Sequence, residues 1–412
     1  MRSTNILGLA ICLWTGGPIC AAQSTPANQS PSWSQEIVPD LSRAYPGVAP
    51  DLLGSSNRAG VAFLDNGQLI VYAVEPTGHL SSRKSPEISS AFRLRMSLLD
   101  AKSGKQVMTK DWGTRPHDST VQITSGGVLV KTGAVVKLYS TDFAQSRDLP
   151  LALDPNGSYF ISVSASGKTV AISHYFRKEQ HWISHIDMVD ASTLKIRSSW
   201  DQDPPIFYLS MSDEKFITTD PYHSIVSLTQ FGNTSQSKAV PIAGALRQGC
   251  PTGGIGLKMV SDESIILRDC KEVLLLNAGG ASSSLEAFDG NGSAGPATAQ
   301  CGNYMPSMFN RMAAMASDAP LVALYLPAIK IKKHLLTEPN VCLTGLQVAV
   351  YDLSRKRRAF TAEVAPLPKN DFDFVLSPDG SKLAILNDRK VSVYSVPAPS
   401  TENAPITPEH ER

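Results

Sequence analysis

A short pattern of strand, tight turn and strand recurs seven times along this chain of 412 residues. The clearest copy lies near the C-terminus, where the strand-like run 371–376, with alternating apolar residues, is followed by Ser377-Pro378-Asp379-Gly380 and a second strand-like run at 382–386. Proline at the second turn position and glycine at the fourth are typical of a type I turn. The third turn residue falls at 67, 127, 156, 214, 263, 319 and 379, so six steps cover 312 residues and the mean repeat is 52. A unit of this length holds four strands with their loops, which is the content of one β-propeller blade.

A second pattern marks the outer part of three units. In each one an apolar run ends in an aspartate, a polar turn follows, and a large aromatic residue comes eight to twelve positions after the aspartate. The aspartates are Asp100, Asp190 and Asp352, and the aromatic residues are Trp112, Trp200 and Phe360. An aspartate side chain can bond the backbone of the turn that follows it. We therefore expect an outer hairpin at each of these places.

The segment Phe374-Val375-Leu376-Ser377-Pro378-Asp379-Gly380-Ser381-Lys382-Leu383-Ala384-Ile385 resembles the repeat of YVTN-type and WD-repeat-like bacterial β-propellers. The resemblance covers roughly residues 55 to 396, although the Trp-Asp dipeptide and Gly-His pair of true WD repeats are absent from their expected places. It implies an all-β fold, a single seven-bladed β-propeller, and it implies no particular activity, because propellers serve as lactonases, dehydrogenases, peptidases and scaffolds. The alternative fold, a pair of β-sandwiches, gives no reason for seven similar units.

The last unit has only three strands before Pro397-Ala398-Pro399, a segment that cannot add a fourth. The first unit is preceded by surplus residues. We therefore predict that a stretch between Trp33 and Leu53 adds the outermost strand of the last blade and closes the ring. On this interpretation the propeller spans residues 33–396, and the Ser-, Thr-, Pro- and Asn-rich segments 23–32 and 397–412 are flexible tails.

The N-terminus has the form of a secretory signal peptide over residues 1–22. Arg2 is positive, the run from Ile6 to Trp14 is apolar, and Cys20-Ala21-Ala22 provides small residues for cleavage before Gln23. A lipid anchor at Cys12 or Cys20 is the alternative, but each follows an isoleucine where a small residue is expected. No apolar run reaches the roughly 20 residues of a membrane span. The expected location is the periplasm or the outside of the cell.

Charge excludes one class of partner. Lys plus Arg number 38 and Asp plus Glu 37, whereas proteins that bind nucleic acid or anionic membranes through a general field carry a surplus of basic residues. We therefore expect no nucleic-acid partner. We also expect a monomer, with no metal ion and no cofactor.

Four cysteines remain after cleavage, Cys250, Cys270, Cys301 and Cys342, in a compartment where disulfides persist. They permit three pairings, and no Cys-x-x-Cys motif suggests redox or zinc chemistry. Within the repeat, each pair would join an inter-blade connection to the second-to-third-strand connection of the same blade. The repeat thus favours Cys250 with Cys270 and Cys301 with Cys342.

Three units carry long insertions at the second-to-third-strand connection, at 75–93, 173–187 and 327–345, which places all three on one face. Loops longer than a connection requires are frequent binding sites. The insertions contain Arg83, Lys84, Arg177, Lys178, His181, Lys330, Lys332, Lys333 and His334 and few acids. We expect this face to bind a protein, peptide or glycan, with a preference for an anionic partner. The competing interpretation is that the loops are merely solvated and lysine-rich.

An enzyme is the alternative function: a lactonase-like or other hydrolase with a metal or polar site in the central channel. Such a site needs several carboxylates at the entrances of the inner strands, and only Asp118, Asp371 and Asp373 are near those positions. A Gly-x-Ser-x-Gly motif is missing, and the glycine-rich run 253–258 lacks the ending of a phosphate loop. His174, His181 and His185 are close in sequence, but this spacing indicates a metal site only on a helix. No catalytic residue is assigned.

Overall fold

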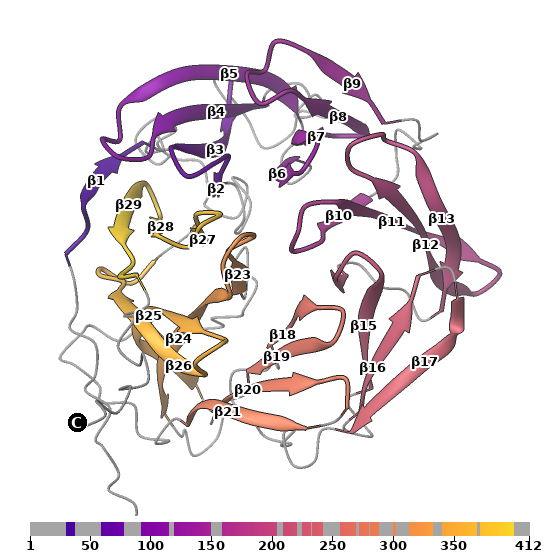
Figure 1. Ribbon diagram of the computed structural model, residues 1–412. Coiled ribbons are helices and arrows are strands. Elements are labelled where there is room, and N and C mark those ends of the chain that lie inside the picture. The colour runs from indigo at the N-terminus through magenta and orange to yellow at the C-terminus, as the bar shows by residue number, and fades with distance from the viewer. Residues whose placement is uncertain are drawn as a thin grey trace, which may run out of the picture.

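The computed structural model is a ring of seven antiparallel sheets around a central axis (Figure 1). It describes residues 30–37, 59–77, 92–114, 119–149, 159–203, 209–220, 225–231, 233–241, 256–268, 272–279, 281–287, 300–301, 313–332, 340–368 and 371–398. These residues contain strands and turns and no helix. The expectation of a seven-bladed β-propeller is confirmed.

Each of the first three blades is a four-stranded meander in chain order. Blade 1 consists of β2 (Ala59–Phe63), β3 (Gln68–Pro76), β4 (Phe92–Asp100) and β5 (Gln106–Thr114). Blade 2 consists of β6 (Ser119–Thr124), β7 (Gly127–Thr132), β8 (Val135–Tyr139) and β9 (Ser146–Asp148). Blade 3 consists of β10 (Tyr159–Val163), β11 (Thr169–Lys178), β12 (His181–Asp190) and β13 (Ile196–Gln202).

The next three blades follow the same order, with one addition. Blade 4 consists of β14 (Ser210–Met211), β15 (Lys215–Asp220), β16 (Ile225–Gln230) and β17 (Asn233–Pro241). Blade 5 consists of β18 (Gly256–Ser261), β19 (Ser264–Arg268), β20 (Glu272–Asn277) and β21 (Ser282–Ala287). Blade 6 consists of β23 (Ala313–Met315), β24 (Leu321–Lys332), β25 (Asn340–Asp352) and β26 (Arg357–Glu363), and the short β22 (Gln300–Cys301) also pairs with β25.

The last blade is completed by the beginning of the described chain, as predicted. Its strands are β27 (Phe372–Leu376), β28 (Lys382–Asn387), β29 (Lys390–Ser395) and β1 (Trp33–Glu36). Trp33 lies opposite Val393, and the Trp33 indole donates a 2.9 Å hydrogen bond to the carbonyl of Ala101 in blade 1. The ring is therefore closed by pairing between segments more than 350 residues apart.

The core is divided among the blade interfaces. The buried apolar side chains form seven clusters in the described residues, and each cluster lies between two neighbouring blades. Strands alternate their side chains between the two faces, and both faces of a blade are covered in a propeller. This accounts for inner strands that are buried throughout, such as β2 and β27.

The predicted outer hairpins are present. The Asp100 carboxylate accepts hydrogen bonds from the backbone N–H groups of Lys102 and Ser103, and Asp190 does the same for Ser192 and Thr193. Asp352 likewise accepts from the N–H groups of Ser354 and Arg355. The aspartate thus bonds the turn backbone in all three blades.

One of the seven predicted turns was wrong. The sequence placed the inner turn of blade 3 at Asp154-Pro155-Asn156-Gly157, which lies outside the described residues. The described inner strand β10 begins later, at Tyr159, and its turn to β11 is formed by 164–168. Gly167 adopts a φ of +73° there, as Gly380 does (+72°) in the turn of the last blade. The blade 3 inner turn is therefore about ten residues further along the chain than predicted.

Within the described ranges no helix is long and apolar enough to cross a bilayer.

Candidate binding face

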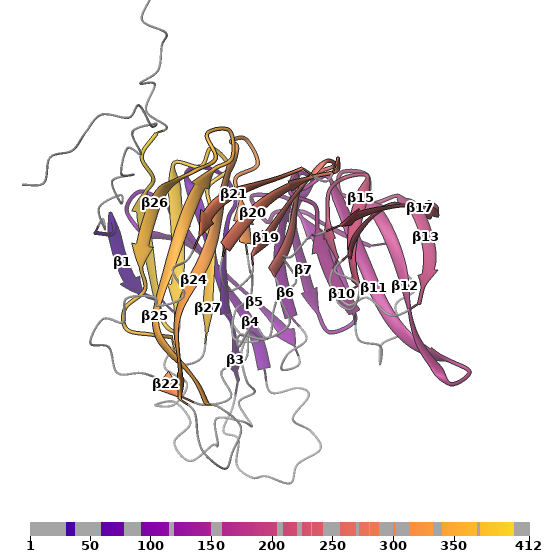
Figure 2. The same ribbon diagram turned by 90° about the horizontal axis from the view of Figure 1, so that it is seen from below.

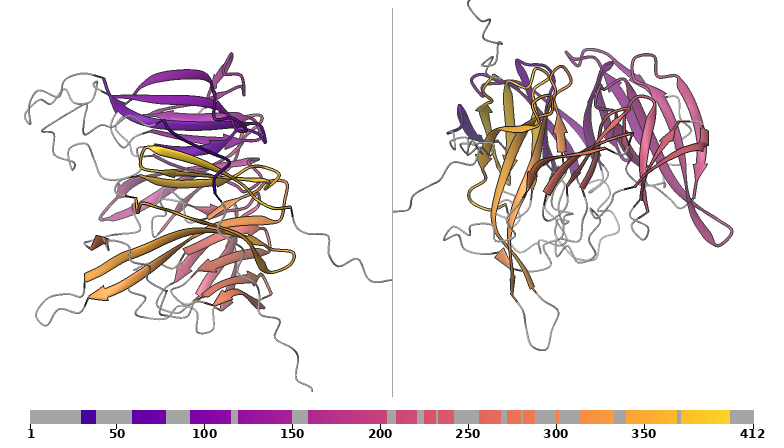
Figure 3. Two further views of the ribbon diagram at one scale, coloured as in Figure 1. Left: turned by 90° about the vertical axis from the view of Figure 1, so that its left-hand side faces the viewer. Right: turned by 60° about the horizontal axis from the view of Figure 1, so that its bottom comes forward.

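Two blades project beyond the ring on the same side. In blades 3 and 6 the second and third strands continue past their neighbours, and both hairpins point to the same face of the propeller (Figures 2 and 3). The pairing of β11 with β12 runs without a gap from Thr169↔Asp190 to Lys178↔His181. We expected the insertion at 173–187 to form a loop, but it is the end of a regular hairpin. The insertion at 327–345 likewise prolongs β24 and β25.

The predicted site residues are distributed unevenly over this face. Arg83, Lys84, Lys333, His334, Cys250 and Cys270 lie outside the described residues. Lys330 and Lys332 are backbone positions of β24, and Cys301 and Cys342 are backbone positions of β22 and β25. Arg177, Lys178 and His181 are exposed at the tip of the blade 3 hairpin. Three of the predicted binding residues therefore gather at the tip of this hairpin.

The blade 3 hairpin is supported only at its base. The inner strand β10 pairs with β11 as far as His174, and the outer strand β13 pairs with β12 as far as Ser184. Beyond these residues the two hairpin strands pair with each other, and Glu179 takes a φ of +55° at the tip. Beyond the base, the two strands are joined by a continuous antiparallel ladder.

A row of aromatic rings lies on one side of the projection. The rings of Phe160 and Tyr175 are stacked with centroids 5.9 Å apart, and the rings of Tyr175 and Trp182 meet edge to face at 5.4 Å. Trp182 is 52% exposed. Leaving half of an indole in water forgoes about 2 kcal/mol of hydrophobic stabilisation. A rigid, exposed tryptophan of this kind points to an interaction site more than to packing.

The two sides of the hairpin differ in chemistry. Side chains of β11 alternate, and Ala171 packs in the cluster shared with blade 4, whereas Ile172 packs in the cluster shared with blade 2. Tyr175 and Arg177 therefore share the blade 4 side with Trp182, which is opposite Arg177 in the register. Lys178 belongs to the blade 2 side, and its ammonium lies 4.0 Å from the Asp201 carboxylate.

Two of the three histidines noted in the sequence meet on the blade 2 side. His174 and His185 are opposite each other across β11 and β12, with ring centroids 5.2 Å apart. His185 lies between two carboxylates: Nδ1 is 2.8 Å from Asp201 and Nε2 is 3.4 Å from Asp187. His181 is separate, at the exposed tip. No set of three His, Cys, Asp or Glu residues with metal-site geometry occurs in the described part of the chain.

An ionic network marks the base of the insertion in blade 1. Arg93 donates to the buried carboxylate of Glu75 at 3.1 and 3.2 Å, and Arg95 lies 3.4 Å from the same oxygen. Arg95 also donates to Asp111, and this hydrogen bond, together with the charges of Glu75 and Asp111, raises the pKa of the Arg95 guanidinium despite its partial burial. These cations are neutralised within the blade and are not part of a free basic surface.

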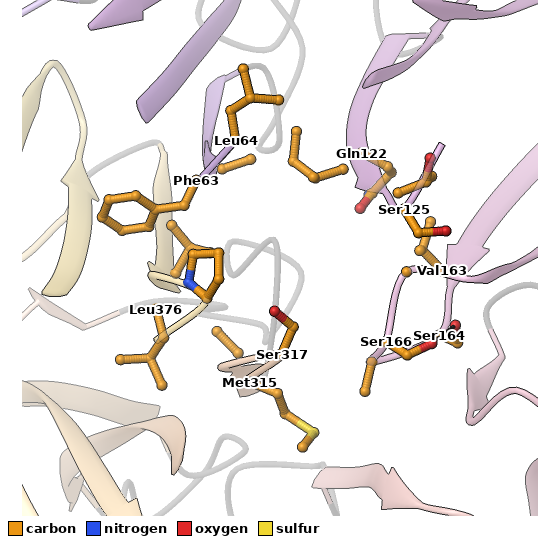
Figure 4. Close-up of a pocket in the computed structure, with 18 of the residues that line it drawn as sticks. Phe63, Leu64, Gln122, Ser125, Val163, Ser164, Ser166, Met315, Ser317 and Leu376 are labelled. Atoms are coloured by element: carbon orange, nitrogen blue, oxygen red, sulfur yellow. Dashed lines mark hydrogen bonds between the residues drawn. The ribbon is translucent and has the colours of Figure 1, made fainter. Parts of the chain in front are cut away.

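The central channel opens at the opposite face, where the first-to-second-strand turns meet. A cavity of about 310 Å³ lies there, and Figure 4 shows the labelled side chains surrounding an open centre. Its lining combines apolar residues with hydroxyl and amide groups. The apolar residues include Phe63, Leu64, Val163, Met315, Leu376 and Pro378, and the polar ones are Ser125, Ser164, Ser166, Ser317, Thr124 and Gln122. Lys258 is the one charged residue of the described lining, which includes no carboxylate and no imidazole.

Two of the carboxylates considered for a hydrolase site form hydrogen bonds between blades. Asp373 is fully buried and accepts a 2.9 Å hydrogen bond from the N–H of Val61, which joins the last blade to the first. The Asp371 carboxylate accepts from the N–H of Ala59 at 3.4 Å. Asp118 lies outside the described residues. These contacts give blade-joining roles to two of the three candidate carboxylates.

The aromatic row was missed in the sequence. Phe160, Tyr175 and Trp182 come from three strands, and only the register of those strands brings them together. The available signal was weak: the segment 175–182 contains two aromatic pairs of the form Tyr-Phe and His-Trp around four polar residues. That arrangement is compatible with a hairpin tip, but Glu179-Gln180 is not a common turn dipeptide.

Comparison with known proteins gives a likeness in fold. No family model matches this sequence, and no curated protein sequence matches it. Among solved structures, the chain is similar to the WD40 domain of Pan2 from Neurospora crassa, with 13% identity over 91% of this chain and 99% of that one and a TM-score of 0.43. It is also similar to a chain of a mitotic checkpoint complex (10% identity, 96% and 100% covered, TM-score 0.44) and to the C-terminal WD40 domain of Sif2 (12%, 84% and 97%, 0.43). Such scores carry no argument about function, and the assignment of a seven-bladed β-propeller rests on the strand pairing.

Proposed function

We propose that this protein is an interaction module that binds a partner on the face from which the hairpins of blades 3 and 6 project. The partner is a protein, a peptide or a glycan. The observation that carries this proposal is the regularly paired blade 3 hairpin, which extends beyond its own blade and keeps Trp182 half exposed beside Tyr175 and Arg177. Contiguous exposed apolar surface commonly marks an interaction site, and the Trp182 ring continues into those of Tyr175 and Phe160.

We further propose that the protein acts outside the cytoplasm after cleavage of residues 1–22, with Cys301 and Cys342 joined. Support for the pairing comes from the backbone, since Cys301 and Cys342 are direct partners in the register of β22 and β25. Opposite residues of an antiparallel pair have Cα atoms about 4.5–5.5 Å apart, which is within the range of disulfides. The corresponding pairing of Cys250 with Cys270 remains a prediction.

A site-specific cross-linker tests the proposed face in the native host. A photoreactive amino acid is placed at Gln180 on the blade 3 hairpin, at Ala328 on the blade 6 hairpin, or at Lys102 on the opposite face as the control. We expect irradiation to give an adduct of defined mass from Gln180 or Ala328 and none from Lys102. Equal labelling from both faces, or no adduct from either hairpin, would contradict the proposal.

The hydrolase alternative is tested on the same preparation. Purified protein is assayed against lactone and ester substrates, and its metal content is measured. Turnover that is lost when Lys258 or Gln122 in the channel is replaced would move the function to the opposite face.

A further inference from the structure

The blade 4 side of the blade 3 hairpin combines an open strand edge, an aromatic row and a cation. We propose that this surface docks an extended, acidic segment of a partner protein. The segment adds to the free edge of β12, places an apolar side chain on Trp182 and brings a carboxylate to Arg177. This inference rests on the proposed function and specifies the surface and the chemistry of the partner.

Both strands of the projection have an open edge, β11 after His174 and β12 before Ser184, and the proposed docking edge is that of β12. The outer strand β13 pairs with β12 only from Ser184 onward, and in the described part of the chain no strand covers the outer edge before it. Hydrogen-bonded pairs alternate along β11 and β12, so in this stretch Trp182 is the residue whose N–H and C=O face the open edge. The chain after Asp203 continues with Pro204 and Pro205, whose nitrogens carry no hydrogen to extend the ladder. An exposed edge offers main-chain groups to another strand, and proteins use such edges to bind extended peptides.

The side chains next to this edge are of the types that contribute most to protein interfaces. Trp, Tyr and Arg dominate the residues whose loss weakens binding strongly. Trp182 and Tyr175 are in edge-to-face contact, and Tyr175 is backed by Phe160, so the rings are fixed before any partner arrives. A preorganised surface loses little side-chain freedom on binding.

The charge on this side is unbalanced. Arg177 is exposed, lies opposite Trp182, and takes part in no ion pair among the residues that the structure describes. Asp201 and Asp187 are engaged on the other side, where Asp201 is within 4.0 Å of Lys178 and 2.8 Å of His185, and Glu179 lies in the turn at the tip. A carboxylate on the incoming segment would complement Arg177 without displacing an existing partner.

A peptide fits this surface better than a glycan because of the edge. Aromatic rings alone can stack on a sugar, but the outward N–H and C=O of Trp182 are best complemented by the backbone of another strand. The proposal therefore requires main-chain pairing in addition to side-chain contact.

The test begins with a displayed library of random peptides selected on the full-length protein, in parallel with a glycan array. We expect the enriched peptides to be acidic and to lack proline in their central part. One such peptide is synthesised, and its dissociation constant is measured by calorimetry at low and high salt. Trp182→Ala and Arg177→Glu are each expected to weaken binding at least tenfold, about 1.4 kcal/mol. Methylation of alternate backbone nitrogens of the peptide is expected to do the same.

Matched variants separate this site from general effects. Ile196→Ala removes another exposed apolar side chain of the same blade, and Lys102→Glu reverses a charge on the opposite face. Both are expected to bind the peptide within twofold of the parent, and melting temperatures show whether each variant is folded. Enrichment of glycans, absence of acidic peptides, or unchanged affinity of Trp182→Ala overturns the inference. If the partner still cross-links from Ala328 in the Trp182→Ala and Arg177→Glu variants, the proposed function stands and the inference fails.

Discussion

Asp190 shows how one carboxylate can hold a turn at the rim of a blade. It accepts hydrogen bonds from the N–H of Thr193, from the hydroxyl groups of Ser192 and Thr193, and from the N–H of Ser192, and these lower the pKa of Asp190 from its usual 3.8 to about 2. A carboxyl group with a depressed pKa in the folded state contributes stability above its unfolded pKa. That contribution is lost as the pH falls from about 4 toward 2.

The first prediction follows from this pKa. At pH 6, Asp190→Asn is expected to lower the free energy of unfolding by about 1 kcal/mol, a value reduced for the partial exposure of the group. The difference from the parent should shrink between pH 4 and 2, as measured by urea unfolding. Asp148→Asn, an exposed carboxylate in β9, is the control and should have a smaller effect. A difference that is constant over this pH range would refute the role of Asp190.

A buried cation joins blades 5 and 6. Arg268 is 7% exposed, donates to the carbonyl of Tyr325 at 2.7 Å and to its hydroxyl at 3.2 Å, and lies 4.2 Å from the centre of its ring. Arg268→Ala is expected to lower the free energy of unfolding by about 3 kcal/mol, because it leaves a cavity and an unsatisfied carbonyl. Arg268→Met, which keeps most of the volume, should cost less. If Arg268→Ala were no more disruptive than Arg197→Ala at an exposed ion pair, the inter-blade role would be wrong.

At the scale of the element, β1 is a short strand with contacts to two blades. Its four residues pair with β29, while Trp33 covers Gly104 in blade 1, where an added Cβ would lie 2.9 Å from the indole. Gly104 also has a φ of +73°, so the turn beneath the indole requires glycine. The strand therefore links the last blade to the first by a ladder and by a packed aromatic ring.

Removing β1 is expected to open the ring. Deletion of residues 33–36 should expose the edge of β29 and cause association through it, and Trp33→Ala should lower the free energy of unfolding by about 2 kcal/mol. Light scattering and thermal melting measure the two effects, and Trp33→Phe should recover part of the stability. A deletion variant that stays monomeric with the parent's melting temperature would show that closure does not depend on this strand.

Local patterns in the sequence were enough to predict most strands and the closure of the ring. The residues of the turns mark the strand ends, and the last unit visibly has three strands instead of four. The third inner turn was misplaced because Asp154-Pro155-Asn156-Gly157 has stronger turn residues than Ser164-Ala165-Ser166-Gly167. Both Ser164-Ala165-Ser166-Gly167 and Ser377-Pro378-Asp379-Gly380 have serine at the first and glycine at the fourth turn position, and this match would have located the third inner turn. The aromatic row could not be predicted, since the contact between Tyr175 and Trp182 depends on a register set by the whole hairpin.

At the scale of the molecule, the oxidation state of the cysteines indicates the compartment, and their pairing tests the assignment of residues to blades. Non-reducing peptide mapping of protein recovered from its native host is expected to show a fragment that joins Cys301 to Cys342. This bond would close a loop of about 40 residues, and its reduction should lower the free energy of unfolding by about 3 to 4 kcal/mol. Four free thiols, or a fragment linking Cys250 to Cys301, would contradict the pairing and the proposed export.

The positions of the two projecting hairpins limit what can touch both. Blades 3 and 6 are three steps apart in a ring of seven, so their tips lie nearly across the ring from each other, about 150° apart. A short peptide can reach one tip only, whereas a globular partner or a chain with two linked segments can span the ring and contact both tips. Engagement of the second tip would then be intramolecular, and its strength would depend on how well the partner's width matches the distance between the tips.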